Sequence, residues 1–411
     1  MLKFVCYLKF IDIVSFVWVL LWILPQLGYL PFYNYIWMIC YAYWIIFLFL
    51  HKKIYSGRNQ TIFIIYIVFM VLISSICFLF DRLGVLKNYI DISQIIMPYF
   101  MYLYYKTRGT KTGLTFICFI LPVIIFVTVV TIIGLMINPF ASRVINTGGE
   151  GRYEDLNINI GGYIFIYTAL LLAVVVFYYF LKVKGQPIVR IMAFGLFGIL
   201  SYLVMLSNFF TAIALLLTFV AILFFCSNKN YLKIVIPLAL ILLPTYKYVG
   251  STAIDGICMV LNEDGKNYLR FKEIQRSIEG KEKISDDVNT RKEVKAKSID
   301  TFFEFPLTGA IVDSSMDNDN FAPIGRHSNI LDTFAIFGLG IGGLFIMVFA
   351  MPFYVIYKLS HTYAQKLFVI TIAVLFFMLM YNNNTTASMG FAVYFIFPFT
   401  YDYLTEKGFL N

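Results

Sequence analysis

The chain contains repeated apolar runs of about 20 residues, the length that crosses the hydrocarbon core of a bilayer as an α-helix. Of its 411 residues, 60% are hydrophobic and only 13% are charged, which is about half the charged share of a soluble domain. Too little polar surface remains to cover a water-soluble globule. A transmembrane β-barrel needs short alternating segments, and these runs do not alternate. The sequence therefore predicts an all-α polytopic membrane protein.

We expect about twelve transmembrane helices. The apolar runs lie at approximately 10–28, 31–50, 61–80, 88–105, 114–137, 159–181, 191–206, 208–226, 231–247, 329–357, 364–381 and 386–404. Helices 1–9 then fall within residues 1–247, which also hold a polar loop at 138–158. A long polar loop follows at 248–328, and helices 10–12 fall within 329–411.

The net charge is +9, and the placement of its Lys and Arg residues predicts how the chain is oriented in the membrane. Five short connectors contain Lys and Arg but no Asp or Glu: 51–60, 106–112, 182–190, 227–233 and 358–366. A count of twelve spans places all five on one side, and by the positive-inside rule that side is the cytoplasm, with both termini there. Loops 138–158 and 248–328 then face outward. This distribution of charge favours the lipid bilayer as partner and argues against nucleic acid.

Two segments of the long loop, 265–279 and 288–304, have the periodicity of short amphipathic helices. Phe271, Ile274 and Ile278 line one face of the first, and Val294, Ile299, Phe302 and Phe303 give the second an apolar stripe. Pro306 ends the second segment, since proline cannot continue a helix. Basic amphipathic helices of this kind commonly lie on the membrane surface.

His327 is the first candidate for chemistry. It is the one histidine on the expected outer side, and it directly precedes an apolar helix that Ser328 or Asn329 can cap. The free N–H groups at such a helix start favour a nearby anion, and Arg326 adds a fixed charge. A neutral imidazole there can take a proton from a hydroxyl. A surface histidine beside a cap is an alternative of equal weight.

The expected outer side also carries arginines that can hold phosphate through their planar guanidinium groups. They are Arg143, Arg152, Arg270, Arg276, Arg291 and Arg326. For any single one of them, a solvated surface pair with a nearby glutamate is the favoured alternative.

No metal or cofactor is expected. Asp317-Asn318-Asp319 has the form of a DxD metal motif, but the surrounding Ser, Asn and Asp residues are more typical of a solvated turn. The six cysteines have no CxxC spacing, which excludes an evident zinc site or disulfide framework. We find no P-loop, GxSxG or HExxH motif, so ATP-driven activity has no support.

Two stretches of the sequence carry recognisable motifs, and each begins with an Arg and leads into a helix. The later stretch contains Arg291, Pro306-Leu-Thr-Gly309, His327-Ser328, and then Gly338, Gly340, Gly342 and Gly343. The earlier stretch contains Arg152, Asn157-Ile-Asn159 and Gly161-Gly162. With the pattern of spans, these motifs resemble the O-antigen polymerase and O-antigen ligase superfamily of bacterial polysaccharide assembly.

The chain departs from that family at two places. The family's Ser-Arg-Gly at a later outer helix junction reads here Ser207-Asn208-Phe209, without the Arg. The second glycine of its Gly-x-x-Gly is displaced by one position, with Ile341 in its place.

The resemblance implies a substrate and a mechanism. Donor and acceptor would be glycans linked to undecaprenyl pyrophosphate, joined on the outer face of the bacterial cytoplasmic (inner) membrane by a metal-independent, inverting glycosyltransferase that needs no cofactor. His327 would be the catalytic base or would orient the acceptor. Arg152, Arg291, Arg326 and Arg143 would bind the pyrophosphate, while Ser328, Asn329 and Gly338 would shape the helix start.

The expected product is an O-antigen or capsule-like polymer, as in lipopolysaccharide biosynthesis. The close alternative is the O-antigen ligase, which these residues do not separate from a polymerase, and a chain-length regulator remains an open partner. A lipid-linked oligosaccharide flippase also has about twelve spans, but short loops and intramembrane charges are typical of it. A peptidoglycan glycosyltransferase needs a catalytic Asp in its large outer loop, and the His-Gly pattern argues against it.

Overall fold

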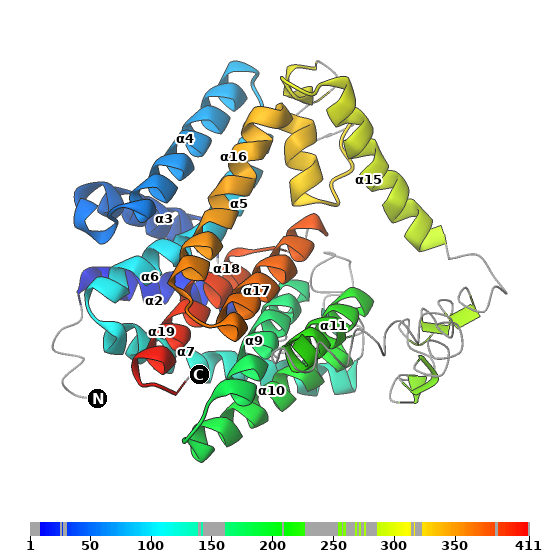
Figure 1. Ribbon diagram of the computed structural model, residues 1–411. Coiled ribbons are helices and arrows are strands. Elements are labelled where there is room, and N and C mark those ends of the chain that lie inside the picture. Colours follow the sequence, from blue (N-terminus) through cyan, green and yellow to red (C-terminus); the bar gives the residue numbers. More distant parts are fainter. Residues whose placement is uncertain are drawn as a thin grey trace.

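The computed structural model describes most of the expected spans and part of the long loop (Figure 1). The described residues are 9–24, 27, 31–138, 141–142, 161–207, 209–226, 254–256, 258–259, 268, 271–272, 275–276, 286–313, 316, 323–382 and 385–409, with side chains 226 and 286–292 left out. Within these ranges the chain forms helices and no β-strand, which confirms the all-α class.

The elements follow the apolar runs closely. The α-helices are α2 (Phe10–Ile23), α3 (Tyr33–Leu50), α4 (Arg58–Leu79), α5 (Leu83–Ser93), α6 (Met97–Thr107), α7 (Thr110–Ile137), α9 (Tyr163–Lys182), α10 (Pro187–Leu206), α11 (Phe210–Cys226), α15 (Asp286–Glu304), α16 (Asn329–Leu359), α17 (Tyr363–Tyr381), α18 (Ala387–Phe391) and α19 (Phe397–Glu406). Short 3₁₀ or π turns are η2 (Lys52–Ile54), η3 (Gln94–Ile96), η6 (Ala310–Val312) and η7 (Ala392–Ile396).

Within the described residues, seven helices are long and apolar enough to cross a membrane: α3, α4, α7, α9, α10, α16 and α17. Two shorter apolar helices, α2 and the Phe210–Phe225 stretch of α11, accompany them. The expected span 88–105 is divided by η3 into α5 and α6, because Pro98 stands in the first turn of α6 and cannot continue the preceding hydrogen bonds. The expected span 231–247 lies outside the described residues. These helices are consistent with a multi-pass membrane protein.

Helix α9 occupies the centre of one half of the bundle. It packs against α10, α11 and α17, and α9, α10 and α11 lie side by side in Figure 1. The ring of Tyr178 on α9 stacks on Phe368 of α17 with centroids 3.7 Å apart. Helices α4 and α16 pack together in the other half. Large aromatic side chains therefore join helices that are distant in sequence.

Two of the five basic connectors, 106–112 and 182–190, meet both ends of the described chain at one end of the bundle. We call it the basic end and define it as residues 9–12, 106–112, 182–190 and 402–409. The polar contacts there are Arg108 with Asp12, Lys106 with Asp402, Thr110 with Glu406, and the backbone N–H of Lys184 with the carbonyl of Phe409. The chain termini of the described structure lie here together with connectors that the sequence assigned to a single side.

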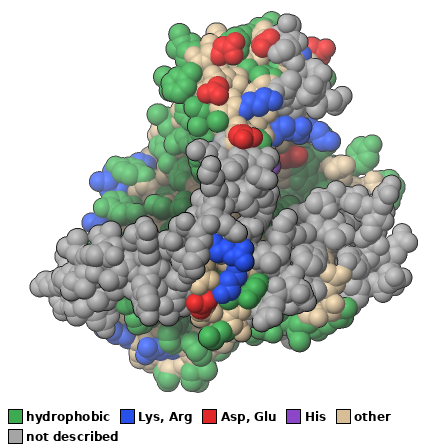
Figure 2. Space-filling model, turned by 90° about the vertical axis from the view of Figure 1, so that its right-hand side faces the viewer, with side chains coloured by type: hydrophobic (Ala, Val, Ile, Leu, Met, Phe, Trp, Pro, Cys, Tyr) green, Lys and Arg blue, Asp and Glu red, His purple; other side chains and the backbone are tan. Residues whose placement is uncertain are grey.

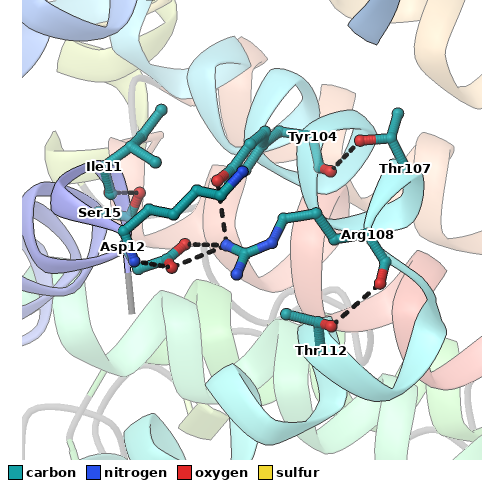
Figure 3. A network of polar contacts seen from close by, with 8 residues as sticks. Ile11, Asp12, Ser15, Tyr104, Thr107, Arg108 and Thr112 are labelled. Atoms are coloured by element: carbon teal, nitrogen blue, oxygen red, sulfur yellow. Dashed lines mark hydrogen bonds and ion pairs between the residues drawn. The ribbon is translucent and has the colours of Figure 1, made fainter. Parts of the chain in front are cut away.

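The strongest of these contacts joins the start of α2 to the end of α6 (Figure 3). Arg108 Nη1 donates to both carboxylate oxygens of Asp12, at 2.6 and 2.7 Å, and to the hydroxyl of Tyr104 at 3.0 Å. The Lys9 N–H also donates to Asp12. Asp12 is only 2% exposed, so its charge depends on these donors for compensation.

Replacement of Asp12 by Ala should destabilise the bundle strongly, because the partly buried charge of Arg108 would lose the carboxylate that compensates it. We expect a loss of about 3–5 kcal/mol in the free energy of unfolding. The matched control is Lys106→Ala, which removes an ion pair whose Lys side chain is 43% exposed and should cost less than about 1 kcal/mol. Unfolding of both variants in mixed micelles measures the difference, and equal losses would contradict the expectation.

The opposite helix termini form a second end, the loop end, defined as residues 81–91, 141–142, 161–162, 323–329, 382 and 385–388. The polar contacts that tie it together are Arg82 Nη2 to the carbonyl of Asp313 (3.0 Å), Ser142 Oγ to the carbonyl of Gly161 (2.8 Å), Lys295 Nζ to Asn382 Oδ1 (2.9 Å) and Asn329 Nδ2 to Thr385 Oγ1 (2.6 Å). Segments from the whole length of the chain therefore converge at this end.

The long loop contributes α15, which matches the expected helix 288–304 and ends just before Pro306. It packs against α16 at the top of Figure 1. Only part of the expected apolar stripe packs on the bundle: Phe302 is half-buried with its ring edge against Phe334 of α16, whereas Phe303 is 72% exposed. The fully buried positions include Ser298 and Thr301, because their hydroxyl groups find hydrogen-bond partners in α16 and in the segment before it.

The described part of the other expected amphipathic segment packs on the bundle. Phe271 is buried with its ring edge against Phe210 of α11. Lys272 donates to Asp255 at 2.7 Å, and this bond holds the pKa of the Asp255 carboxyl below its ordinary value. Phe271, on the apolar face of this segment, therefore contacts a helix of the bundle.

Candidate functional site

The motif residues Pro306, Gly309 and Gly338 interlock. The Leu339 N–H donates to the Pro306 carbonyl at 2.8 Å, at the point where Gly338, with φ of 71°, breaks the helical geometry of α16. Gly309 also has positive φ, and a Cβ at either glycine would overlap a backbone carbonyl oxygen of the facing segment. Only glycine permits this approach. Gly338 thus lies at the break between the two helical parts of α16, where the second part starts, beyond the first turns that follow His327.

The turn that carries Arg326 and His327 is held by the first turns of α16. Ser328 is the N-cap, and its hydroxyl accepts from the Leu331 N–H at 3.2 Å. The Asp332 carboxylate accepts from the backbone N–H groups of Ser328 and Arg326. A carboxylate so close to a helix N-terminus is favoured by the helix dipole, so Asp332 organises the turn.

Helix α15 fixes the other side of the same turn. Ser298 Oγ donates to Asp332 at 2.6 Å and accepts from the Gly325 N–H at 2.9 Å. Gly325 lies directly against the backbone of Val294, where a Cβ would overlap a carbonyl oxygen. The turn is therefore held between α15 and α16 by hydrogen bonds from their side chains to its backbone and by the close approach of Gly325 to Val294. These contacts do not involve the His327 ring.

Arg326 and His327 themselves are exposed. Arg326 has φ of 60°, a conformation that non-glycine residues adopt rarely and that clusters at functional sites. The His327 imidazole lies within electrostatic range of Asp332. Figure 2, which faces α15, shows acidic and basic side chains together in its upper part. The turn thus presents an imidazole and a guanidinium outward from a rigid base.

A cavity of about 930 Å³ lies at the loop end. Its walls come from the end of α2, the start of α3, α5 with Gln94, the start of α9, and residues 385–388. Asn329, two residues after His327, and Gly162, which ends the earlier motif, both line it. The last glycine of the earlier stretch and the residue that follows His327-Ser328 in the later stretch therefore line the same cavity.

Hydroxyl and amide groups make up one wall of this cavity. Asn329 Nδ2 donates to Thr385 Oγ1 at 2.6 Å, and Ser388 Oγ is bonded to Thr168 at 2.8 Å and to Thr386 at 3.0 Å. Polar groups that are already paired within the wall hold fixed positions. The wall thus offers an ordered polar surface to a ligand.

The structure describes only some of the residues that the sequence proposed. Arg143, Arg152, Arg270, Asp317 and Asp319 lie outside the described residues, and Arg291 is placed on α15 by its backbone alone. His327, Arg326, Ser328 and Asn329 are brought together at the loop end. Among the described residues, no three His, Cys, Asp or Glu side chains gather in a way that suits a metal ion.

Sequence reasoning missed Asp332, Ser298 and the α5 wall of the cavity. Asp332 was predictable from the sequence, since an acidic residue in the first turns of a helix commonly stabilises the N-terminus of that helix. No sequence pattern marks Ser298, because its hydrogen-bond partners come from segments far along the chain. Gln94, buried in a largely apolar run, was a signal of the kind that marks functional positions within membrane segments.

Comparison with known proteins adds no relative. No protein-family model matches the chain, and no curated protein is significantly similar to it.

Proposed function

We propose that the chain is a polysaccharide polymerase that joins lipid-linked repeat units into an O-antigen or capsule-like polymer. The observation that supports it most is the meeting of Gly162 and Asn329 on one cavity, beside the exposed Arg326-His327 turn. Both segments come from the motifs that resemble the O-antigen polymerase and ligase superfamily. A rigid turn with an imidazole beside a large cavity that has one polar wall suits a transfer reaction between two bulky substrates.

In the proposed reaction, a hydroxyl oxygen of the acceptor sugar attacks the anomeric carbon of the donor. The bond from that carbon to the phosphate oxygen breaks, its electron pair leaves with the polyprenyl pyrophosphate, and the configuration at the carbon inverts. His327 takes the hydroxyl proton. The donor already contains a reactive sugar–phosphate bond, so the step needs no nucleotide.

Arginines supply the charge that the departing pyrophosphate requires. We assign this role to Arg326, which adjoins His327, to Arg152 and Arg291 on the strength of the motifs, and to Arg143, which is in the same expected outer loop as Arg152. A guanidinium binds two phosphate oxygens at once, and it remains charged at any physiological pH.

We further propose about twelve spans in the bacterial cytoplasmic membrane. The convergence of residues 9–12, 106–112, 182–190 and 402–409 at the basic end supports cytoplasmic termini, because connectors rich in Lys and Arg stay on that side. The loop end would then face outward, where the lipid-linked glycan is presented.

The decisive experiment is a reaction of the purified protein with a synthetic undecaprenyl-pyrophosphate repeat unit. A ladder of lengthened glycans is the expected product, and it should form in the presence of EDTA. Transfer of the unit to lipid A–core without lengthening would identify a ligase instead. Movement of the unit across vesicles without any new glycosidic bond would identify a flippase.

Arg152 and Arg291 should each be essential in that assay. We expect Ala at either position to lower the rate by about 100-fold or more, and Lys to restore only part of it, because the ammonium group lacks the two-pronged geometry. Arg190→Ala, at the basic end, is the matched control and should retain activity. Full activity in the Lys variants would show that a simple charge is sufficient.

A further inference from the structure

The α5 side of the cavity differs in chemistry from the Arg326-His327 turn. Its described charged side chains are Lys87 and Asp91, which stand four residues apart on one face of α5 and offset each other. The other polar side chains of the described lining, including Asn34 and Asn88, are neutral. This wall thus has little net charge, and it suits an uncharged ligand better than a pyrophosphate.

Two buried polar atoms at this wall have no hydrogen-bond partner among the described residues: Gln94 Oε1 and Trp22 Nε1. Gln94 is 2% exposed, and its amide N–H makes only a long bond of 3.4 Å to the carbonyl of Asp91. One of the two atoms accepts and the other donates. A hydroxyl group can donate to the first or accept from the second, so a ligand with several hydroxyls can pair with each of them.

The wall also offers flat aromatic surfaces. Trp37 of α3 lines the cavity and lies nearly parallel to Tyr41, with an interplanar angle of 19°. Tyr41 is itself fixed by bonds to Tyr66 at 2.6 Å and Ser93 at 2.9 Å. A rigid ring beside amide and carboxylate groups matches a sugar, which has an apolar face of C–H groups and a polar edge of hydroxyls.

We propose that this part of the cavity is a saccharide subsite in which Gln94 and Asp91 accept hydrogen bonds from the hydroxyls of a neutral sugar that packs on Trp37. The identity of the sugar, as part of a repeat unit, rests on the proposed function. No arginine is among the described residues that line the cavity, and the subsite selects the glycan by its hydroxyl pattern.

The test is direct binding to the full-length protein in nanodiscs, without catalysis. One probe is the lipid-free oligosaccharide released by mild acid from the polyprenyl-linked glycan of the producing cell, and the other is inorganic pyrophosphate. We expect Gln94→Met to raise the dissociation constant of the oligosaccharide about tenfold, the loss of one good hydrogen bond. Asp91→Asn should raise it less, because the amide oxygen still accepts but has lost the charge that strengthens the bond. The dissociation constant of pyrophosphate should be unchanged in Gln94→Met, which alters no charge. Asp300→Asn, an exposed carboxylate on α15, is the matched control and should bind both probes as the unaltered protein does.

Thermal stability separates binding from folding. Gln94→Met removes a buried oxygen that has no partner, so its melting temperature should be equal to or higher than that of the unaltered protein. A lower melting temperature with unchanged oligosaccharide affinity would assign Gln94 a structural role and overturn the subsite. Absence of oligosaccharide binding by the unaltered protein would overturn it as well.

The subsite and the proposed function can fail separately. Oligosaccharide binding that depends on Gln94 and Asp91, in a protein that forms no glycan ladder, would support the subsite and reject the polymerase. A ladder formed equally well by the two variants, with unchanged affinity, would support the polymerase and reject the subsite.

Discussion

His327→Ala should abolish glycan lengthening while the protein still inserts and folds. Loss of a positioned general base lowers a rate by about 10²–10⁴-fold, which in cells leaves single repeat units on the surface glycan. The substitution should not disturb the fold, because His327 is exposed and its turn is held by Ser298, Ser328 and Asp332. Glycan length on gels and the rate with the synthetic donor measure the effect.

His361→Ala is the matched control, since His361 is also exposed and lies between α16 and α17 at the other end of those helices. It should give glycan of normal length. Normal length in His327→Ala would remove His327 from the mechanism and leave the alternative of a surface histidine beside a cap.

Gly309→Ala should separate the long loop from α16. The new Cβ would overlap the backbone of Ile336, and the residue would also be held at φ of 73°, which costs a non-glycine residue roughly 1–2 kcal/mol before any clash. The clash forces the Pro306–Leu339 contact apart and frees α15. We expect loss of lengthening together with rapid proteolytic cleavage within 286–313.

Gly57→Ala isolates the effect of the clash. Gly57 has φ of 57°, but a Cβ there meets nothing within 4 Å. This variant is therefore destabilised only by the positive φ and not by a clash. Limited proteolysis from the loop side and the melting temperature compare the two. Equal behaviour of Gly309→Ala and Gly57→Ala would show that the interlock between the two motifs does not hold α15 in place.

The positions of most helices were predictable from the sequence, because a bilayer imposes a length and an apolar composition on each span. The start of α16 at Asn329 and the end of α15 before Pro306 followed from local rules for caps and proline. The buried face of α15 did not follow. Periodicity favoured its apolar residues, whereas hydrogen bonds to Asp332 and Pro323 bury Ser298 and Thr301.

The role of the motif glycines was also out of reach of local rules. The pattern Pro306-x-x-Gly309 and the later Gly338 stood out in the sequence, but their spacing says nothing of contact. The structure brings their backbones together at a kink, where a side chain at either glycine would fill the space of a carbonyl. Such contacts depend on two segments being docked, so no window of sequence contains them.

The all-α class, the apolar runs and the exposed Arg326-His327 pair before a helix cap were determined by the sequence alone, since hydrophobicity and capping act on neighbouring residues. The cavity was decided only by the tertiary structure. Its walls join the ends of α2, α3, α5, α9 and α16 with residues 385–388, and these meet because aromatic and polar contacts pack the helices in one order. Packing depends on contacts between segments that are distant in the sequence, and these contacts place Gln94 and Asp91 at the same cavity as Asn329.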